Sequence, residues 1–299
     1  MWVARSYLNG FVERKIVIMK RKNSRFIIGI LSICVFLGCI LYIADFYYQG
    51  YAYQKRNQSI SAIIKEEANN SGQFGQLEDT KEADVNLSEA DNFSNILESS
   101  LKPGRILPEF MEVYEKNRDF IGWLTIADTI IDYPVMQGDD NKYYLDHDFY
   151  GEETKHGSLF LDYKNNVLSP NSNLIIYGHN MKDGTMFSAL RKYKDQSFYE
   201  DHKVISFHTI YEKAQYEIVS VFLSKVYLKD EDTFKYYQFI QASNQEEFDE
   251  FYNNIKELSL YDTGNEAQYG DIFLTLSTCD YTTKDGRLAV VAKKLQDEE

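Results

Sequence analysis

The apolar residues of this chain form one long run near the N-terminus and many short runs further on. Residues 26–44 carry no charged side chain, and 19 residues suffice to cross a bilayer as a helix. The short runs are rich in β-branched and aromatic residues, which favour strands. They predict strands at about residues 121–126, 129–136, 157–162, 173–177, 204–208, 215–226, 272–279 and 287–292.

Three other segments have helical spacing of their apolar positions. They cover residues 108–117, with Pro108 in the first turn, residues 184–199, and residues 244–258. Eight short strands with few helices favour a mainly β fold, a barrel rather than a doubly wound parallel sheet.

Charge is divided unevenly around the apolar run. Of 32 Lys/Arg and 46 Asp/Glu, residues 1–25 hold seven basic side chains and one acid, so 25 basic and 45 acidic residues follow position 44. Basic flanks stay cytoplasmic, which predicts a cytoplasmic tail at 1–25, a transmembrane anchor at 26–44 and an exported remainder. Residues 45–104 are mostly polar and predict a stalk, and the folded domain is expected at 105–299.

A cleaved signal peptide is the competing interpretation of the apolar run. The run is long for a signal peptide, and the sequence Asp-Phe-Tyr-Tyr-Gln-Gly after residue 44 is not a small-x-small cleavage site, which favours an uncleaved anchor. Met19 is followed by Lys-Arg-Lys-Asn and resembles a translation start, so residues 1–18 are expected to be an upstream extension.

The charge of the exported part, −20, argues against nucleic-acid binding, because phosphate contacts require Lys/Arg clusters. The sequence shows neither a phosphate-binding glycine loop nor a dinucleotide motif. His147 and His156 do not have the i, i+4 spacing of a helical zinc site. We therefore expect no cofactor and no metal.

One cysteine lies outside the apolar run. Cys34 and Cys39 fall within the run, which leaves Cys279 alone at the end of a predicted strand. An unpaired cysteine in an exported domain is a candidate nucleophile, and a buried cysteine that packs as a small apolar side chain is the alternative.

Two further residues fit a thiol mechanism. His179 follows the strand at 173–177 and could exchange a proton with a thiol, and Arg287 opens the next strand after Cys279 and could stabilise an oxyanion. Taken singly, each also fits an ordinary surface or structural side chain.

The combination is more specific. Thr-Leu-Ser-Thr-Cys279 at a strand end, Arg287 eight residues later and Gly-His179-Asn-Met one hundred residues before the cysteine resemble the sortases, class B in particular, over residues 105–299. These are membrane-anchored cysteine transpeptidases of Gram-positive bacteria. The resemblance implies a closed eight-stranded β-barrel, an added N-terminal helix and a long helix before the strand that bears the cysteine.

The resemblance also implies a mechanism and partners. Cys279 attacks the carbonyl after the Thr of a C-terminal sorting signal, His179 acts as general acid and then base, and Arg287 holds substrate and oxyanion. An amine of a cell-wall precursor then accepts the protein from a thioacyl enzyme. Substrate contacts carried over from the family are Asn141, Leu145, Tyr177, Thr233, Tyr237 and Ser277.

Two other functions remain open from the sequence. A cysteine peptidase would use the same residues with water as the acceptor. A non-catalytic binding module on a stalk would need none of them.

Overall fold

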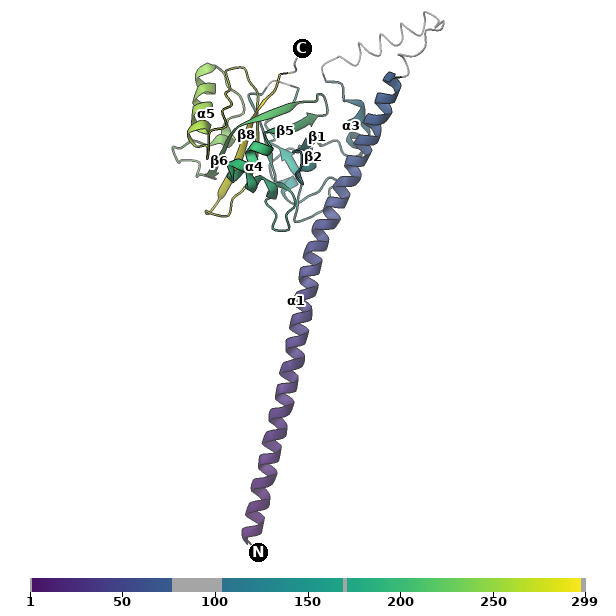
Figure 1. Ribbon diagram of the computed structural model, residues 1–299, viewed down its shortest axis with the longest axis vertical. Coiled ribbons are helices and arrows are strands. Elements are labelled where there is room, and N and C mark those ends of the chain that lie inside the picture. The colour runs from purple at the N-terminus through teal and green to yellow at the C-terminus, as the bar shows by residue number, and fades with distance from the viewer. Residues whose placement is uncertain (1, 77–103, 169–170, 297–299) are drawn as a thin grey trace, which may run out of the picture. The chain divides into compact units, whose positions relative to one another are not determined.

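The computed structural model describes residues 2–76, 104–168 and 171–296 (Figure 1). It divides into two compact units, residues 1–51 and 52–299, and helix α1 (Trp2–Gln76) contributes to both. The predicted stalk therefore falls partly on a helix, up to Gln76, and partly on residues 77–103, which lie outside the described residues.

The first unit is the N-terminal part of α1. Most of its apolar side chains between Ile30 and Tyr48 are exposed, and the stretch Gly29–Asn70 contains a segment long and apolar enough to cross a membrane, with a mean hydropathy of 2.2. An exposed apolar cylinder of this length is suited to a lipid environment, as a membrane anchor or a signal sequence.

The second unit is built on a closed sheet of eight strands. In sheet order they are β1-β2-β3-β4-β7-β8-β6-β5, and pairing of β1 with β5 closes the ring. Pairs β2–β3 and β4–β7 are parallel, and the other pairs are antiparallel. The bounds are β1 (Phe120–Thr125), β2 (Asp132–Met136), β3 (Leu159–Leu161), β4 (Asn173–Tyr177), β5 (Val204–Thr209), β6 (Gln215–Lys225), β7 (Phe273–Cys279) and β8 (Gly286–Lys294). The predicted closed eight-stranded barrel is confirmed.

Helices cover the outside of this barrel, because the strands also carry apolar side chains on their outer face. Alternate residues of a strand point to opposite faces, and in β7 Leu276 joins the barrel core while Phe273 joins an outer cluster. Helix α5 (Gln245–Glu257) completes that outer cluster with Phe248 and Phe251, and Figure 1 shows it beside β6 and β8. Helix α3 (Pro108–Lys116) packs against β1.

The helical segment predicted at 184–199 is instead two shorter helices, η2 (Phe187–Lys194, a 3₁₀-helix) and α4 (Gln196–Asp201). The prediction of one helix was wrong because Asp195 interrupts it. Asp195 has extended backbone angles, φ −100° and ψ 122°, and its side chain accepts a hydrogen bond from the Ser197 N–H. That is the geometry of an N-cap, which ends one helix and starts the next. Two further 3₁₀ turns are η1 (Tyr143–Leu145) and η3 (Tyr236–Gln238).

The strand predicted at 129–136 begins only at Asp132. Asp128 has a φ of +57°, and the Thr129 hydroxyl bonds back to the Ile126 carbonyl at 2.8 Å while accepting from the Ile131 N–H at 3.0 Å. Side-chain bonds of this kind replace the ladder bonds of a sheet and form a turn. Residues 129–131 therefore extend the turn between β1 and β2.

The end of α1 is part of the core of the second unit. Tyr53, Asn57, Ile60 and Ser61 are buried, and Ile60 packs in a cluster with Phe110 and other side chains from α3, β1 and the loops beside them. These positions follow a spacing of four, three and one, which places them on one face of a helix. Part of the segment expected to be a stalk thus supplies core side chains.

Shortening Ile60 to alanine tests whether this part of α1 stabilises the domain. Ile60 is 1% exposed, so Ile60→Ala should lower the free energy of unfolding by about 2–5 kcal/mol through lost burial and a residual cavity. Gln58→Ala, on the exposed face of the same helix turn, is the control and should change it by less than about 0.5 kcal/mol. Chemical denaturation of the full chain in detergent measures both, and equal effects would show that α1 does not contribute to the core.

Candidate active site

The register between β7 and β8 brings a thiol and a guanidinium together. Seven consecutive pairs run from Phe273 opposite Lys293 to Cys279 opposite Arg287. Directly opposed residues of an antiparallel pair point to the same face of the sheet. Cys279 and Arg287 therefore lie side by side at the end of the barrel, as the sequence predicted from their positions at the ends of neighbouring strands.

The turn that follows Cys279 is held by backbone bonds. The Asp280 N–H donates to the Gly286 carbonyl at 2.9 Å, and the Gly286 N–H donates to the Thr283 carbonyl at 3.2 Å. A side chain at Gly286 would place its Cβ 2.4 Å from the Asp280 carbonyl oxygen, so the close approach requires glycine. The Asp280 N–H is consequently engaged in the turn and is not a donor for an oxyanion.

The parallel pair β4–β7 brings the histidine loop to the same end. Tyr177 is opposite Ser277, and beyond the strands the Gly178 N–H donates to the Ser277 carbonyl at 3.2 Å. The Thr278 hydroxyl donates to the Gly178 carbonyl at 2.7 Å, and the Asn180 side-chain amide donates to the Cys279 carbonyl at 2.8 Å. The chain on both sides of His179 is thus tied to the chain around Cys279.

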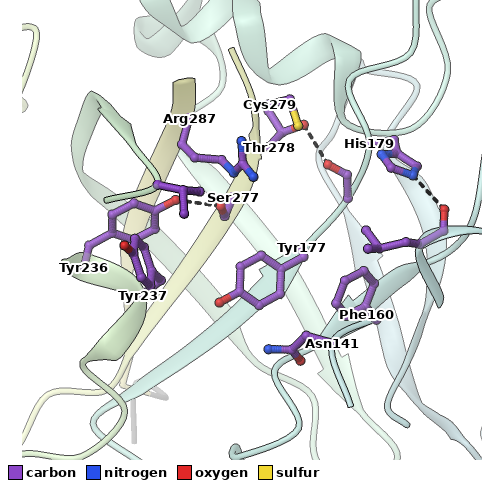
Figure 2. Close-up of a pocket in the computed structure, with 13 residues that line it drawn as sticks. Asn141, Phe160, Tyr177, His179, Tyr236, Tyr237, Ser277, Thr278, Cys279 and Arg287 are labelled. Carbon is purple, nitrogen blue, oxygen red and sulfur yellow. Dashed lines mark hydrogen bonds between the residues drawn. The ribbon is translucent and has the colours of Figure 1, made fainter. Parts of the chain in front are cut away.

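His179 is oriented by a backbone carbonyl. Its Nε2 lies 2.7 Å from the Leu145 carbonyl oxygen. A carbonyl can only accept, so the proton is on Nε2 and the lone pair of the neutral ring is on Nδ1. Figure 2 shows that the other nitrogen of the ring lies on the side toward Cys279. The geometry selects Nδ1 as the nitrogen that can take and return a proton.

Arg287 keeps donors available for a ligand. Its side chain is half-buried, and one Nη1–H donates to the Gly286 carbonyl at 3.0 Å. A guanidinium has five N–H donors in one plane, so this single bond fixes the group and leaves other N–H groups to face the pocket.

A partly buried ion pair lies directly after the thiol. Asp280 is buried and pairs with the partly exposed Lys194 of η2, and its carboxylate also accepts hydrogen bonds from the N–H and hydroxyl of Thr282. Burial by itself would raise the pKa of Asp280, but the bonds from Lys194 and Thr282 hold it below the ordinary value. The negative charge next to Cys279 is therefore matched by a cation.

The three groups share one pocket with a volume of about 400 Å³ (Figure 2). Figure 2 shows Cys279 between Arg287 on one side and His179 on the other, with Tyr177 and Phe160 along the wall. The lining residues are Asn141, Leu145, Phe160, Tyr177, Gly178, His179, Val226, Tyr236, Tyr237, Ser277, Thr278, Cys279 and Arg287.

Comparison with known proteins identifies the family and the fold. The family model described as the sortase domain matches residues 124–295, more than half of the chain. The chain belongs to the sortase family. It is 38% identical over 193 residues to sortase B of Listeria monocytogenes and 36% identical over 190 residues to sortase B of Staphylococcus aureus. These alignments cover 64% and 63% of this chain and 75% of each relative.

A solved sortase B gives the same result in three dimensions. The structure described as a Staphylococcus aureus sortase B–substrate complex superimposes with a TM-score of 0.59 at 31% identity, over 70% of this chain and 93% of that one. The resemblance to class B sortases noted from the sequence is confirmed. The protein is a cysteine transpeptidase of the sortase B type.

Two of the predicted substrate contacts in this sortase share one buried carboxylate. The Asn141 amide and the Tyr177 hydroxyl both donate to Asp162, at 2.8 and 3.0 Å, and the Asn141 side-chain oxygen accepts from the Tyr163 N–H. Burial, and then the nearby Asp162, raise the pKa of Tyr177 above its ordinary value, so the hydroxyl stays protonated as a donor. Both side chains line the pocket in fixed orientations.

The other predicted contacts divide into two groups. Leu145, Tyr237 and Ser277 line the pocket, although the buried Ser277 hydroxyl bonds with Tyr236 at 2.7 Å. Burial raises the pKa of Tyr236 to about 12, and the Ser277 bond and Arg287 oppose that rise. Thr233 is exposed and is not among the residues that line this pocket.

Sequence reasoning missed several residues of the pocket wall. Phe160, Val226, Tyr236, Gly178 and Thr278 line it. Gly178 and Thr278 stand inside the two motifs around His179 and Cys279, so adjacency could have indicated them. Phe160 reaches the pocket because β3 pairs with β4, where it lies opposite Tyr177, and Tyr236 reaches it through its bond with Ser277 of β7; both contacts join residues distant in the chain, which no local pattern contains.

The described ranges 2–76, 104–168 and 171–296 contain no group of three or more His, Cys, Asp or Glu side chains placed to hold a metal ion.

Replacing Thr278 by valine tests the tie between the two motif segments. Thr278 is buried, and valine has nearly the same shape but no hydroxyl, so Thr278→Val leaves the Gly178 carbonyl without its donor. The free energy of unfolding should fall by about 1–3 kcal/mol. Denaturation of Thr278→Val beside Thr233→Val, an exposed control, measures the difference. If the two variants were equally stable, the bond would contribute nothing to the fold.

Proposed function

We propose that Cys279, His179 and Arg287 are the catalytic residues of this sortase and that they transfer a protein from its C-terminal sorting signal to an amine. The observation that carries the proposal is their convergence on one pocket from β7, β8 and the loop after β4. Each supplies one of the roles that acyl transfer requires, a nucleophile, an acid and base, and an oxyanion donor.

The first half of the reaction forms a thioacyl enzyme. The Cys279 sulfur, as thiolate, attacks the carbonyl carbon of the peptide bond on the C-terminal side of the signal's Thr, and the carbonyl oxygen becomes an oxyanion. The C–N bond then breaks, and Nδ1 of the His179 imidazolium gives its proton to the departing amine. Leu145 accepts from Nε2–H throughout and stabilises the positive ring.

The second half returns the enzyme to its starting state. An amine of a cell-wall precursor attacks the thioester carbonyl and loses a proton to Nδ1 of His179. A second oxyanion collapses, the C–S bond breaks, and the sulfur leaves as thiolate. Atoms and charges balance without any further reactant.

Arg287 serves both oxyanions. The Asp280 N–H is engaged in the turn, which leaves the guanidinium as the charged donor beside Cys279. A fixed positive donor in a partly buried site stabilises developing negative charge more strongly than water does, because it need not reorient.

The pocket wall suits an extended peptide. Leu145 and Tyr177 offer apolar surface next to the polar groups at Cys279 and Arg287. A sortase B has been solved with its substrate, and we infer that sorting-signal peptides bind this chain in the same pocket. Asn141, Leu145, Tyr177, Tyr237 and Ser277 are the contacts proposed, with Thr233 further out on the exposed loop before η3.

The location follows from the charge pattern. The apolar segment of α1 is proposed as a single membrane-spanning anchor, with the basic residues 1–25 in the cytoplasm and the barrel outside the cell. The second unit, which contains residues 105–299 and the part of α1 that supplies core side chains, would then act where secreted proteins and cell-wall amines meet.

A ligation assay tests the proposed function. The full chain in detergent is mixed with a sorting-signal peptide and a small amine, and products are identified by mass spectrometry. We expect a peptide joined to the amine, and a thioacyl adduct on Cys279 when the amine is omitted. Cys279→Ala should give neither product while remaining folded. Peptide cleaved by water alone would indicate a peptidase, and turnover by Cys279→Ala would exclude the thiol mechanism.

Replacing Arg287 by lysine separates charge from geometry. Arg287→Lys keeps one positive charge but loses the planar set of donors, so kcat should fall by about 10²-fold or more. The KM for the peptide and the thermal unfolding midpoint should change little. Steady-state ligation rates measure this, and a rate within twofold of the original protein would remove Arg287 from the mechanism.

A further inference from the structure

A buried tyrosine on α1, Tyr53, contacts the loop before β3. Tyr53 is 7% exposed, and its ring stacks on His156, with ring centroids 4.7 Å apart and planes 15° from parallel. Its hydroxyl donates to the Gly157 carbonyl at 2.7 Å. One side chain of the helix therefore fixes two consecutive residues of the loop before β3.

His156 continues this contact into the loop that carries His179. His156 Nε2 lies 2.7 Å from the Asp183 carboxylate, and the two side chains are 4% and 2% exposed. A carboxylate only accepts, so Nε2 bears the proton and Nδ1 can accept from the Thr154 hydroxyl at 3.2 Å. Asp183 also accepts from the N–H and hydroxyl of Thr185. A buried polar network with every member paired is rigid.

Asp183 is ionised in this network. Burial would raise its pKa, but the hydrogen bonds from Thr185 and His156 lower it below the ordinary value. The network therefore contains a carboxylate at neutral pH, and the charge-assisted bond from His156 is stronger than a bond between neutral groups.

The loop held by Asp183 is short and strained. It begins at His179, whose carbonyl accepts from the Phe187 N–H at 2.9 Å, and it ends at Met186, whose φ is +55°. A methionine in the left-handed region costs free energy and persists only where neighbouring contacts impose it. The bond from His156 to Asp183 is one such contact, four residues from His179.

A second series of contacts leads from Tyr53 through Gly157 to Leu145, the hydrogen-bond acceptor of His179. Gly157 has a φ of +56°, and a Cβ there would lie 2.4 Å from the Leu145 carbonyl oxygen, so the two backbone segments touch. The same Leu145 oxygen accepts from His179 Nε2. Tyr53 is therefore connected to the His179 imidazole by two routes. One runs through His156 and Asp183 to the loop that carries His179. The other runs through Gly157 to Leu145, whose carbonyl oxygen lies at hydrogen-bond distance from His179 Nε2.

We propose that Tyr53, His156 and Asp183 are positioning residues that hold His179 in its reactive orientation, so that a segment of α1 is part of the catalytic apparatus. The inference rests on the proposed role of His179 as acid and base. A small misplacement of a proton-transfer group is costly to the rate. Tyr53, His156 and Asp183 are not among the residues that line the pocket. Substitutions in this chain of contacts should therefore lower kcat and leave peptide binding nearly unchanged.

Graded variants of the full chain in detergent test this. Tyr53→Phe keeps the ring stack and removes the hydroxyl that bonds to Gly157, and kcat should fall about threefold. His156→Ala removes the stack and the bond to Asp183, and kcat should fall about tenfold or more. His156→Gln, which can still donate to the carboxylate, should recover part of that loss. The KM for the peptide should stay within twofold for all three variants.

Arg56→Ala is the matched control. Arg56 lies on the same helix and forms ion pairs with Asp148 and Glu152, at 2.6 and 2.7 Å, so its loss weakens the docking of α1 without touching His156. We expect a lower unfolding midpoint with an unchanged kcat. If Arg56→Ala reduced kcat as much as His156→Ala, the helix would act through general stability, and the positioning role would be wrong.

A spectroscopic readout separates this inference from the proposed function. In protein labelled at histidine nitrogens, the Nε2–H signal of His179 should move in His156→Ala and stay in place in Arg56→Ala, whether or not the protein ligates peptides. If the original protein were inactive, the proposed function would be wrong, and the His179 signal would still test the positioning role. If His156→Ala does not fold, the variants Tyr53→Phe and His156→Gln test that role instead. Unchanged kcat and an unchanged His179 signal in the folded variants would overturn the proposal.

Discussion

The site depends above all on the register of one antiparallel strand pair. Seven ladder pairs between β7 and β8 end with Cys279 opposite Arg287, and the backbone bonds of the turn fix how the chain returns. A slip by one residue would send every side chain of a strand to the other face, which would separate the thiol from the guanidinium and disrupt the buried Leu276 and Val290. The packing of the barrel interior and the placement of Cys279 beside Arg287 are therefore set by the same constraint.

The imidazole is placed less directly, since it lies on a loop rather than on a strand. Side-chain bonds from Thr278 and Asn180 compensate for this by tying that loop to the chain at Cys279. Loops position functional groups well when a rigid scaffold supports them. Here the scaffold includes the parallel pair β4–β7 and, through Tyr53 and His156, a helix that the sequence alone suggested was a spacer.

Much of this architecture could be predicted because long apolar runs and turn residues are local signals. β4 was predicted with the same bounds, and α5 to within one residue at each end. Prediction failed where a side chain takes the place of a backbone group in a hydrogen bond. At Asp195, such a bond forms a helix cap that divides the predicted helical segment in two. Prediction also missed contacts between residues distant in the chain. The spacing of Tyr53 and Ile60 on one helix face was visible, but the polar residues around them masked it, and nothing local pairs His156 with Asp183.

Leu145 contributes to the pocket with its side chain and to the orientation of His179 with its backbone. Its side chain is 41% exposed and lines the pocket, while its carbonyl holds the imidazole. A ligand that displaced this leucine would also displace the hydrogen-bond acceptor of His179. Occupancy of the pocket and the orientation of the His179 imidazole are thus linked through a single peptide unit, the one that carries the Leu145 carbonyl.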